Sequence, residues 1–197
     1  IGMVSVCIGM GGMHGVVQAV GRFARGVRST QVVTACMGLA VFFDDYANSV
    51  VVGSTARNLT DARKISREKL AYLVDSTAAP VAGIAFTSSW IGVELKLFSD
   101  HLEAIGGDVM SGYDVFLQVL PYRFYCIFAL ILVFLVALTG RDFGPMLRAE
   151  RRARKTGALT RQGDGSGRIG GDLPEARAGA PARWFNGVIP IAFVVIG

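Results

Sequence analysis

Charged residues are scarce in this sequence, at 18% of 197 residues, whereas hydrophobic residues make up 52%. Soluble domains carry about 25% charged residues, so the composition argues against a soluble protein and favours one embedded in a membrane. Cysteines are few as well. The three that occur, Cys7, Cys36 and Cys126, lie in apolar runs without paired spacing, which indicates small hydrophobic side chains rather than a metal or redox site.

Signatures of nucleotide and nucleic-acid binding are also missing. The glycine-rich stretch at 163–167 lacks the Lys-Ser/Thr ending and the preceding strand of a phosphate-binding loop. The net charge of +5 does not indicate nucleic-acid binding, because the basic residues cluster beside apolar segments, as they do in loops at a membrane surface. We therefore expect the lipid bilayer, and no nucleic acid, as a partner of this chain.

One stretch is apolar enough to cross a bilayer. Residues 122–138 carry a single charge, Arg123 near the start, and an apolar helix of this kind can cross the hydrocarbon core, which is about 30 Å thick. We predict a membrane helix over about 121–139. The first residue is Ile rather than Met, and the apolar run at 184–197 stops before it could span, so we expect a partial chain in which a further membrane helix starts at 184.

Basic and acidic residues occupy different loops. Lys and Arg are absent between Lys96 and Arg123, where the charges are Asp100, Glu103, Asp108 and Asp114. Basic residues instead gather at 22–28, 57–69 and 141–155, which the positive-inside rule assigns to the cytoplasm. We predict a transport region over 1–139 in the cytoplasmic membrane, followed by a basic cytoplasmic linker over 140–183. Glu94 is expected at the outer boundary, with Arg123 extending to the same surface.

Polar residues interrupt a second apolar run at 44–49. Each charge there would cost roughly 2.5 to 3.5 kcal/mol at the bilayer centre unless something offsets it. Basic loops flank this run on both sides, and one crossing would place them in opposite compartments, which the positive-inside rule disfavours. We therefore predict a re-entrant hairpin over about 31–55, with its tip near Asp44 to Asn48.

A third apolar segment, residues 70–98, is interrupted at Asp75 to Pro80. Proline removes a helix hydrogen bond and disfavours helix at the preceding residue, while Ser76 and Thr77 offer replacement oxygens. We predict a broken helix here, and transporters commonly build ion sites at such breaks. The predicted fold class is an all-α polytopic membrane protein with broken helices and a re-entrant hairpin.

The two interruptions supply the oxygen ligands that a small hard cation needs. The candidate ion-binding residues are Asp44, Asp45, Asn48, Ser49, Asp75, Ser76 and Thr77, of which Asp45, Asn48, Asp75 and Thr77 are the hypothetical Na+ ligands. Desolvation disfavours the charged form of a carboxylate at this depth, so one group can hold a proton or a cation in turn. The candidates for proton coupling are Asp44, Asp45, Asp75 and His14. The plainer alternative is that the aspartates merely cap half-helices.

The order of these motifs resembles the NhaC-type Na+/H+ antiporter family, within the ion transporter superfamily. The resemblance is carried by FFDDYANSVVVGST at 42–55, ISREKLAY at 65–72 and VDSTAAPVA at 74–82, with GGMHG at 11–15 and SWIG at 89–92. It covers about residues 1–98 and leaves out the linker at 157–183.

This resemblance implies exchange of Na+ for H+ by a multi-pass protein of the cytoplasmic membrane. It further implies inverted repeats, re-entrant hairpins and a homodimer of the full-length protein, with Na+ and H+ as transported ions and no cofactor. By the same similarity, Asp44, Asp45, Asn48 and Ser49 correspond to a hairpin tip and Asp75, Ser76 and Thr77 to the partner break.

Two other functions remain open. A Na+-coupled carrier of organic anions or amino acids would favour basic groups facing the substrate, and no intramembrane Arg or Lys is evident in the sequence. An intramembrane enzyme could use Asp45 and Asp75 as an acid/base pair, but a nucleophile or metal set that would converge with them is not apparent. We therefore expect a transporter rather than an enzyme.

Overall fold

The computed structural model describes residues 23–42, 44–86, 88–104 and 111–161, together with 183, 185 and 189. The regular elements of this part are all helical, and they are α3 (Val27–Ala40), α4 (Asp45–Ala62), α5 (Arg67–Ile84), α6 (Ser89–Ala104), α7 (Gly112–Val119), the 3-10 helix η1 (Leu120–Tyr122), α8 (Phe124–Thr139) and α9 (Gly144–Thr156). The all-α prediction is confirmed for these residues. The predictions for His14, most of the linker after 161 and the helix starting at 184 lie outside the described residues.

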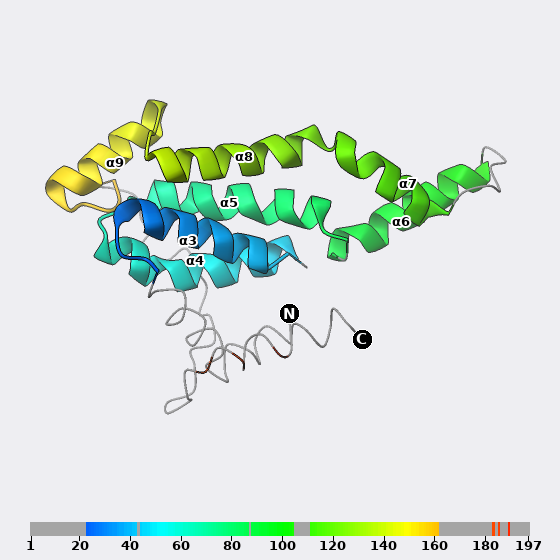
Figure 1. The fold of residues 1–197 in the computed structure, drawn as a ribbon, viewed down its shortest axis with the longest axis horizontal. Helices are drawn as coiled ribbons and strands as arrows, with labels where there is room; N and C mark the ends of the chain where they lie inside the picture. Colours follow the sequence, from blue (N-terminus) through cyan, green and yellow to red (C-terminus); the bar gives the residue numbers. More distant parts are fainter. Residues whose placement is uncertain are drawn as a thin grey trace.

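Helices α3, α4, α5 and α8 pack side by side, while α6 and α7 pair with each other beyond one end of this bundle (Figure 1). The core forms because apolar residues recur every four positions along each helix, which places them on one face. Val33 and Met37 of α3, Val52 and Ala56 of α4, and Leu70 and Val74 of α5 are members of one buried cluster. The sequence periodicity thus explains which helix faces meet.

The chain reverses direction between α3 and α4. Helix α3 ends at Ala40, α4 starts at Asp45, and the two helices contact each other. The reversal falls where the sequence places the hairpin tip, although α4 continues to Ala62, beyond the predicted limit of 55. Whether this hairpin enters the membrane and returns stays a prediction.

Helix α5 runs without interruption through Asp75 to Pro80, so the break predicted there is wrong. A proline inside a helix costs roughly 3 kcal/mol, but Pro80 is buried in a helix that packs against α3, α4 and α8. This packing offsets the lost hydrogen bond. The helix ends at Ile84 instead, and α6 begins at Ser89, so the break within the predicted range of 70–98 lies at 85–88.

Helix α8 agrees with the membrane helix predicted over 121–139. Within the described residues, one segment, Phe124–Thr156, is long and apolar enough to cross a membrane, judged by length and composition alone. Only 17% of its most apolar window is buried inside the protein, and Phe128, Ile131, Leu135 and Leu138 face outward. An outward apolar face of this kind suits contact with lipid. The multi-pass topology stays a prediction.

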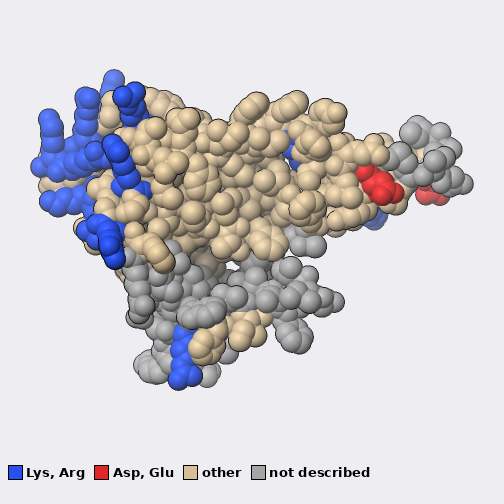
Figure 2. Space-filling view, in the orientation of Figure 1, with Lys and Arg blue, Asp and Glu red and all other residues tan. Residues whose placement is uncertain are grey.

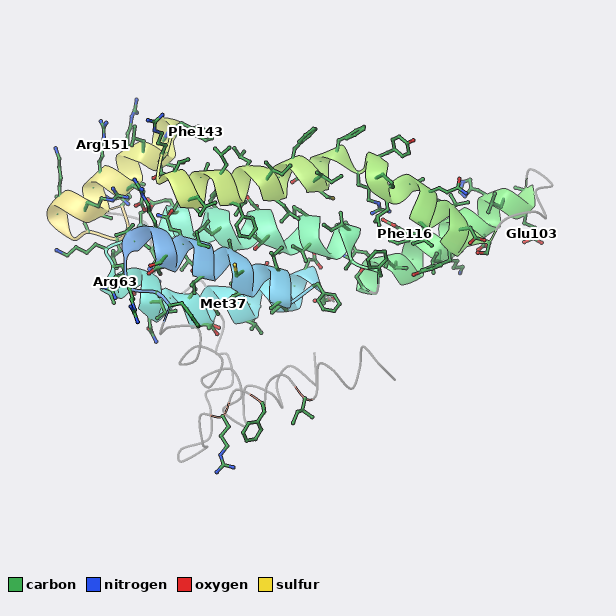
Figure 3. All side chains as sticks on the ribbon, in the orientation of Figure 1. Met37, Arg63, Glu103, Phe116, Phe143 and Arg151 are labelled. Carbon is green, nitrogen blue, oxygen red and sulfur yellow. The ribbon has the colours of Figure 1, made fainter. Side chains whose placement is uncertain are left out.

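Charges of opposite sign gather at opposite ends of the molecule (Figure 2). Arg63, directly after α4, and Arg151 of α9 lie at one end, and Glu103 of α6 lies at the other (Figure 3). We call the first the basic end, made of the start of α3, the end of α4, the start of α5 and α9, and the second the acidic end. The alternation of basic and acidic loops along the sequence therefore becomes a separation of charge in space, as the positive-inside rule expects for a membrane protein.

Candidate ion site at the turn between α3 and α4

Three helices meet at Gly38 of α3. The Nδ2 group of Asn48, on α4, donates hydrogen bonds to the carbonyl oxygens of Gly38 (2.6 Å) and Val41 (2.9 Å), which lie at the end of α3 where helical donors run out. Thr77 of α5 lies so close that a Cβ atom added to Gly38 would be 2.1 Å from Thr77 Oγ1. We call this contact of Gly38, Val41, Asn48 and Thr77 the Gly38 junction. Two of the predicted Na+ ligands, Asn48 and Thr77, thus each contact Gly38.

Asn48 carries an unpaired oxygen at this junction. Its side chain is fully buried, and its Oδ1 atom has no hydrogen-bond partner among the described residues. A buried acceptor without a donor costs roughly 1 to 3 kcal/mol, and an amide oxygen is a ligand of hard cations. The Thr77 hydroxyl donates back to its own helix, 2.8 Å from the Leu73 carbonyl oxygen, so its oxygen lone pairs stay available as acceptors.

Asp44 and Asp45 lie at the start of α4. The backbone carbonyl of Asp44 accepts the Asn48 N–H (3.0 Å), as the residue before a helix does. The Asp45 carboxylate accepts a hydrogen bond from Trp90 Nε1 on α6 (3.2 Å). Because α4 and α6 both begin here, two helix N-termini, which favour negative charge, lie beside the 85–88 break. The capping role that the sequence left open for these aspartates fits this geometry too.

Asp75 is not part of the Gly38 junction. Its side chain is exposed, whereas Thr77 is buried, because two residues along a helix differ by about 200° around its axis. Ser49 and Ser76 are half-buried. The described residues hold no cluster of three His, Cys, Asp or Glu side chains that could bind a metal ion. The structure therefore gathers the predicted ion-binding residues only in part.

An ion pair that the sequence did not predict joins the helices around the break. Arg123, just before α8, pairs with Glu94 of α6 through its two terminal guanidinium nitrogens, with 3.1 Å between Nη1 and Oε1. It also donates to the carbonyl oxygen of Gly83 on α5 (2.8 Å), and it lies 5.1 Å from the ring centre of Phe116. Bidentate pairs of this kind fix geometry well. Glu94 and Arg123 were both expected at the outer membrane boundary. Their pairing, however, depends on the tertiary structure.

A second network holds α9 on the start of α5. Lys69 of α5 is fully buried and pairs with Asp142, in the connection between α8 and α9. Glu150 of α9 accepts hydrogen bonds from the backbone N–H (2.8 Å) and Oγ (2.9 Å) of Ser66, which caps α5. The predicted linker over 140–183 thus begins with a docked helix. The sequence signal for the contact between α9 and Ser66 was Glu150, a single acidic residue within an arginine-rich stretch.

The turn between α4 and α5 is closed by its own ion pair. Arg67 Nη2 lies 2.6 Å from Asp61 Oδ2. Burial lowers the pKa of the Arg67 guanidinium, and the Asp61 carboxylate opposes that change. The pair lies at the basic end, at the turn opposite the Gly38 junction, so it contributes to the hairpin base rather than to the candidate ion site.

Comparisons with known proteins bear on both halves of the chain. Residues 81–196, more than half of the chain, match the sequence profile of a family described as "Na+/H+ antiporter family". A protein of Haemophilus influenzae, named only as uncharacterized, is 32% identical over 172 residues, which cover 87% of this chain and 31% of that protein. The chain thus spans about a third of the length of this relative. No solved structure matches.

The profile match and the motif resemblance cover largely different parts of the chain. They overlap at 81–98, and the match extends through Arg123, α9 and the linker at 157–183, which the resemblance left out. The Gly38 junction and Asp75 precede the matched region. The candidate ion site consequently rests on the residues and their geometry.

Proposed function

Since the chain belongs to the Na+/H+ antiporter family, we propose that it forms part of an NhaC-type secondary transporter, which exchanges Na+ for H+ across the cytoplasmic membrane. The observation that supports this function best is the unpaired, fully buried Oδ1 atom of Asn48. It lies on the first turn of α4, which Asp45 begins. An uncharged oxygen and nearby carboxylates are the groups that a Na+ site needs.

In this proposal Asn48 and Thr77 supply neutral oxygens, and Asp45 supplies the charge that balances Na+. Asp44 and Ser49 flank this set at the tip, and Ser76 flanks it on α5. Protonation of a carboxylate removes the negative charge that holds the cation, so the two ions exclude each other. Asp75 serves as a further proton-coupling carboxylate, and it would meet its partners in the remainder of a longer protein, because it is exposed here. His14 remains a candidate for the same role.

The basic residues at the base of the hairpin support a re-entrant path. Arg28 lies in the first turn of α3 and Arg63 directly follows α4, both at the basic end. Both arms therefore start from the side that we assign to the cytoplasm, and the tip lies within the membrane. The full-length protein would be a multi-pass homodimer with inverted repeats.

Transport in everted vesicles tests the function. Vesicles carrying the full-length parent are energised, and Na+ addition is expected to collapse the pH gradient. Asp45→Asn removes the charge at the tip and should abolish this response, while Asp75→Asn should weaken it strongly. Asp100→Asn, at the acidic end, is the matched control and should leave exchange unchanged.

Two results would contradict the proposal. If Asp45→Asn and Asp75→Asn both exchanged Na+ for H+ like the native protein, neither carboxylate would carry the coupling. If the native protein, folded and inserted, transported an organic solute with Na+ and left the pH gradient intact, the carrier alternative would replace the antiporter.

A further inference from the structure

Helix α9 has an exposed basic face and a buried face without basic residues. Arg148, Arg151 and Lys155 are exposed, and their spacing of three and four residues places them in one stripe along the helix. The buried side of the same helix consists of Ala149, Ala153 and the carboxylate of Glu150. We call the three exposed cations the α9 stripe. No acidic side chain pairs with it in the part of the chain that the structure describes.

The orientation of the stripe is set by contacts on the other faces of α9. Glu150, the one acid of this helix, is 2% exposed and bonds to Ser66. Arg152 forms an ion pair with Glu68 of α5, with 2.7 Å between Nη2 and Oε1. These contacts leave the stripe as the outward surface, with its charge uncompensated. A flexible basic tail would not present three cations in a fixed row.

The stripe also lies directly after the apolar span. α9 starts five residues after the last residue of α8, and Phe143, between them, is 65% exposed. Figure 3 shows Phe143 and Arg151 at the same end of the molecule. Aromatic residues favour the headgroup level of a membrane. A cluster of Lys and Arg just cytoplasmic of a spanning helix attracts anionic lipids.

We infer that the α9 stripe is a binding surface for the headgroups of anionic phospholipids in the cytoplasmic leaflet. The occupant is chosen by charge complementarity and by position: the surface is purely cationic, fixed in orientation, and placed where the apolar face of α8 leaves the hydrocarbon. This inference requires the chain to lie in a membrane, but it does not require exchange of Na+ for H+.

Lipid selectivity measures this interaction directly. The full-length parent is reconstituted in phosphatidylcholine bilayers with trace spin-labelled phosphatidylglycerol or phosphatidylcholine, and the fraction of each label immobilised on the protein is read by electron paramagnetic resonance. Native protein should prefer phosphatidylglycerol by roughly 3-fold or more at low salt. The preference should shrink at about 1 M salt, where the screening length falls to about 3 Å.

The variants locate the effect. Arg148→Gln, Arg151→Gln and Lys155→Gln together should bring the preference close to one. Arg25→Gln, Arg57→Gln and Lys64→Gln together remove the same charge from the same end, outside α9, and should retain the preference. Arg148→Lys with Arg151→Lys keeps the charge and should also retain it. These side chains make no ion pair within the described ranges, so the fold should tolerate each set.

Specific outcomes would overturn the inference. Equal immobilisation of both lipids by the native protein would show that the stripe binds no anionic headgroup. An unchanged preference in the stripe variant would place lipid binding elsewhere. Displacement of the labelled lipid by millimolar soluble glycerol phosphate would assign the stripe to a dissolved anion instead.

Discussion

The Gly38 junction and the basic end both bury polar side chains between helices, but they satisfy those groups to different degrees. At the basic end, Lys69 meets Asp142 and Glu150 meets Ser66. At the junction, Asn48 binds two carbonyls and keeps an unpaired oxygen. A buried charge is tolerated when it is paired, whereas an unpaired acceptor carries a cost that a bound cation would offset. Asp61, Glu68 and Tyr72 at the basic end also keep an oxygen without a partner among the described residues, but these residues are half-buried, whereas Asn48 is fully buried.

Gln31 of α3 is a second buried amide with unpaired atoms, and it must be compared with Asn48. Both polar atoms of its buried side chain also lack partners within the described residues, yet it lies about 10 Å along α3 from Gly38, far from the aspartates of the hairpin tip. An unpaired buried amide alone therefore does not identify an ion site. Proximity to carboxylates is the second requirement, and Gln31 becomes a matched control for Asn48.

The largest change in the free energy of unfolding should come from breaking the buried ion pair between Lys69 and Asp142. Lys69→Met removes the cation from a buried pair and leaves Asp142 unpaired, which should lower the free energy of unfolding by roughly 3 to 5 kcal/mol. The second change Asp142→Leu in the same protein should restore most of that loss. Denaturant unfolding in detergent measures both values, and equal stability of the single and double variants would show that the pair is not buried as described.

The next largest effect tests the packing of the junction. Gly38→Ala places a methyl group against Thr77 and should cost roughly 1 to 3 kcal/mol through overpacking. Gly53→Ala, on α4, meets nothing within 4 Å and should stabilise the protein by up to about 1 kcal/mol through helix propensity. Thermal unfolding of the two variants compares them. A neutral Gly38→Ala would contradict the close approach of α3 and α5.

A third prediction distinguishes Asn48, whose amide oxygen is unpaired, from Gln31, whose whole amide group is unpaired. Asn48→Leu should raise the KM for Na+ by roughly 10-fold, about 1.4 kcal/mol, because it removes an oxygen ligand from the proposed site. Gln31→Leu should leave this KM unchanged, and it can be neutral or stabilising because it removes unpaired buried groups. Initial rates of Na+-driven pH-gradient collapse measure both. A shift of the same size in both variants would argue that buried amides act through general packing.

The smallest effect should come from an exposed ion pair at the basic end. Arg152 and Glu68 are 26% and 40% exposed, so water screens their attraction. Arg152→Gln should change the free energy of unfolding by no more than about 1 kcal/mol, well below the effect of Lys69→Met in the same assay. A larger loss would mean that α9 depends on this pair as well as on Glu150.

Local patterns in the sequence sufficed to predict the helical class, the apolar span that became α8, the position of the reversal near Asp44, and the separation of basic from acidic loops. Each depends on neighbouring residues: apolar periodicity, an interruption of an apolar run, or the charge of a loop. Asp45 and Asn48 were identifiable in the same way, because polar groups stand out in an apolar segment.

The tertiary structure decided the features that depend on residues far apart in the chain. Packing against three helices kept α5 continuous through Pro80, which local propensity disfavours, and moved the break to 85–88. The same packing turned Thr77 inward and left Asp75 exposed. The contacts of Arg123 with Glu94 and of Lys69 with Asp142 span 29 and 73 residues. Such pairings cannot be read from local sequence, because they depend on which helices the fold places side by side.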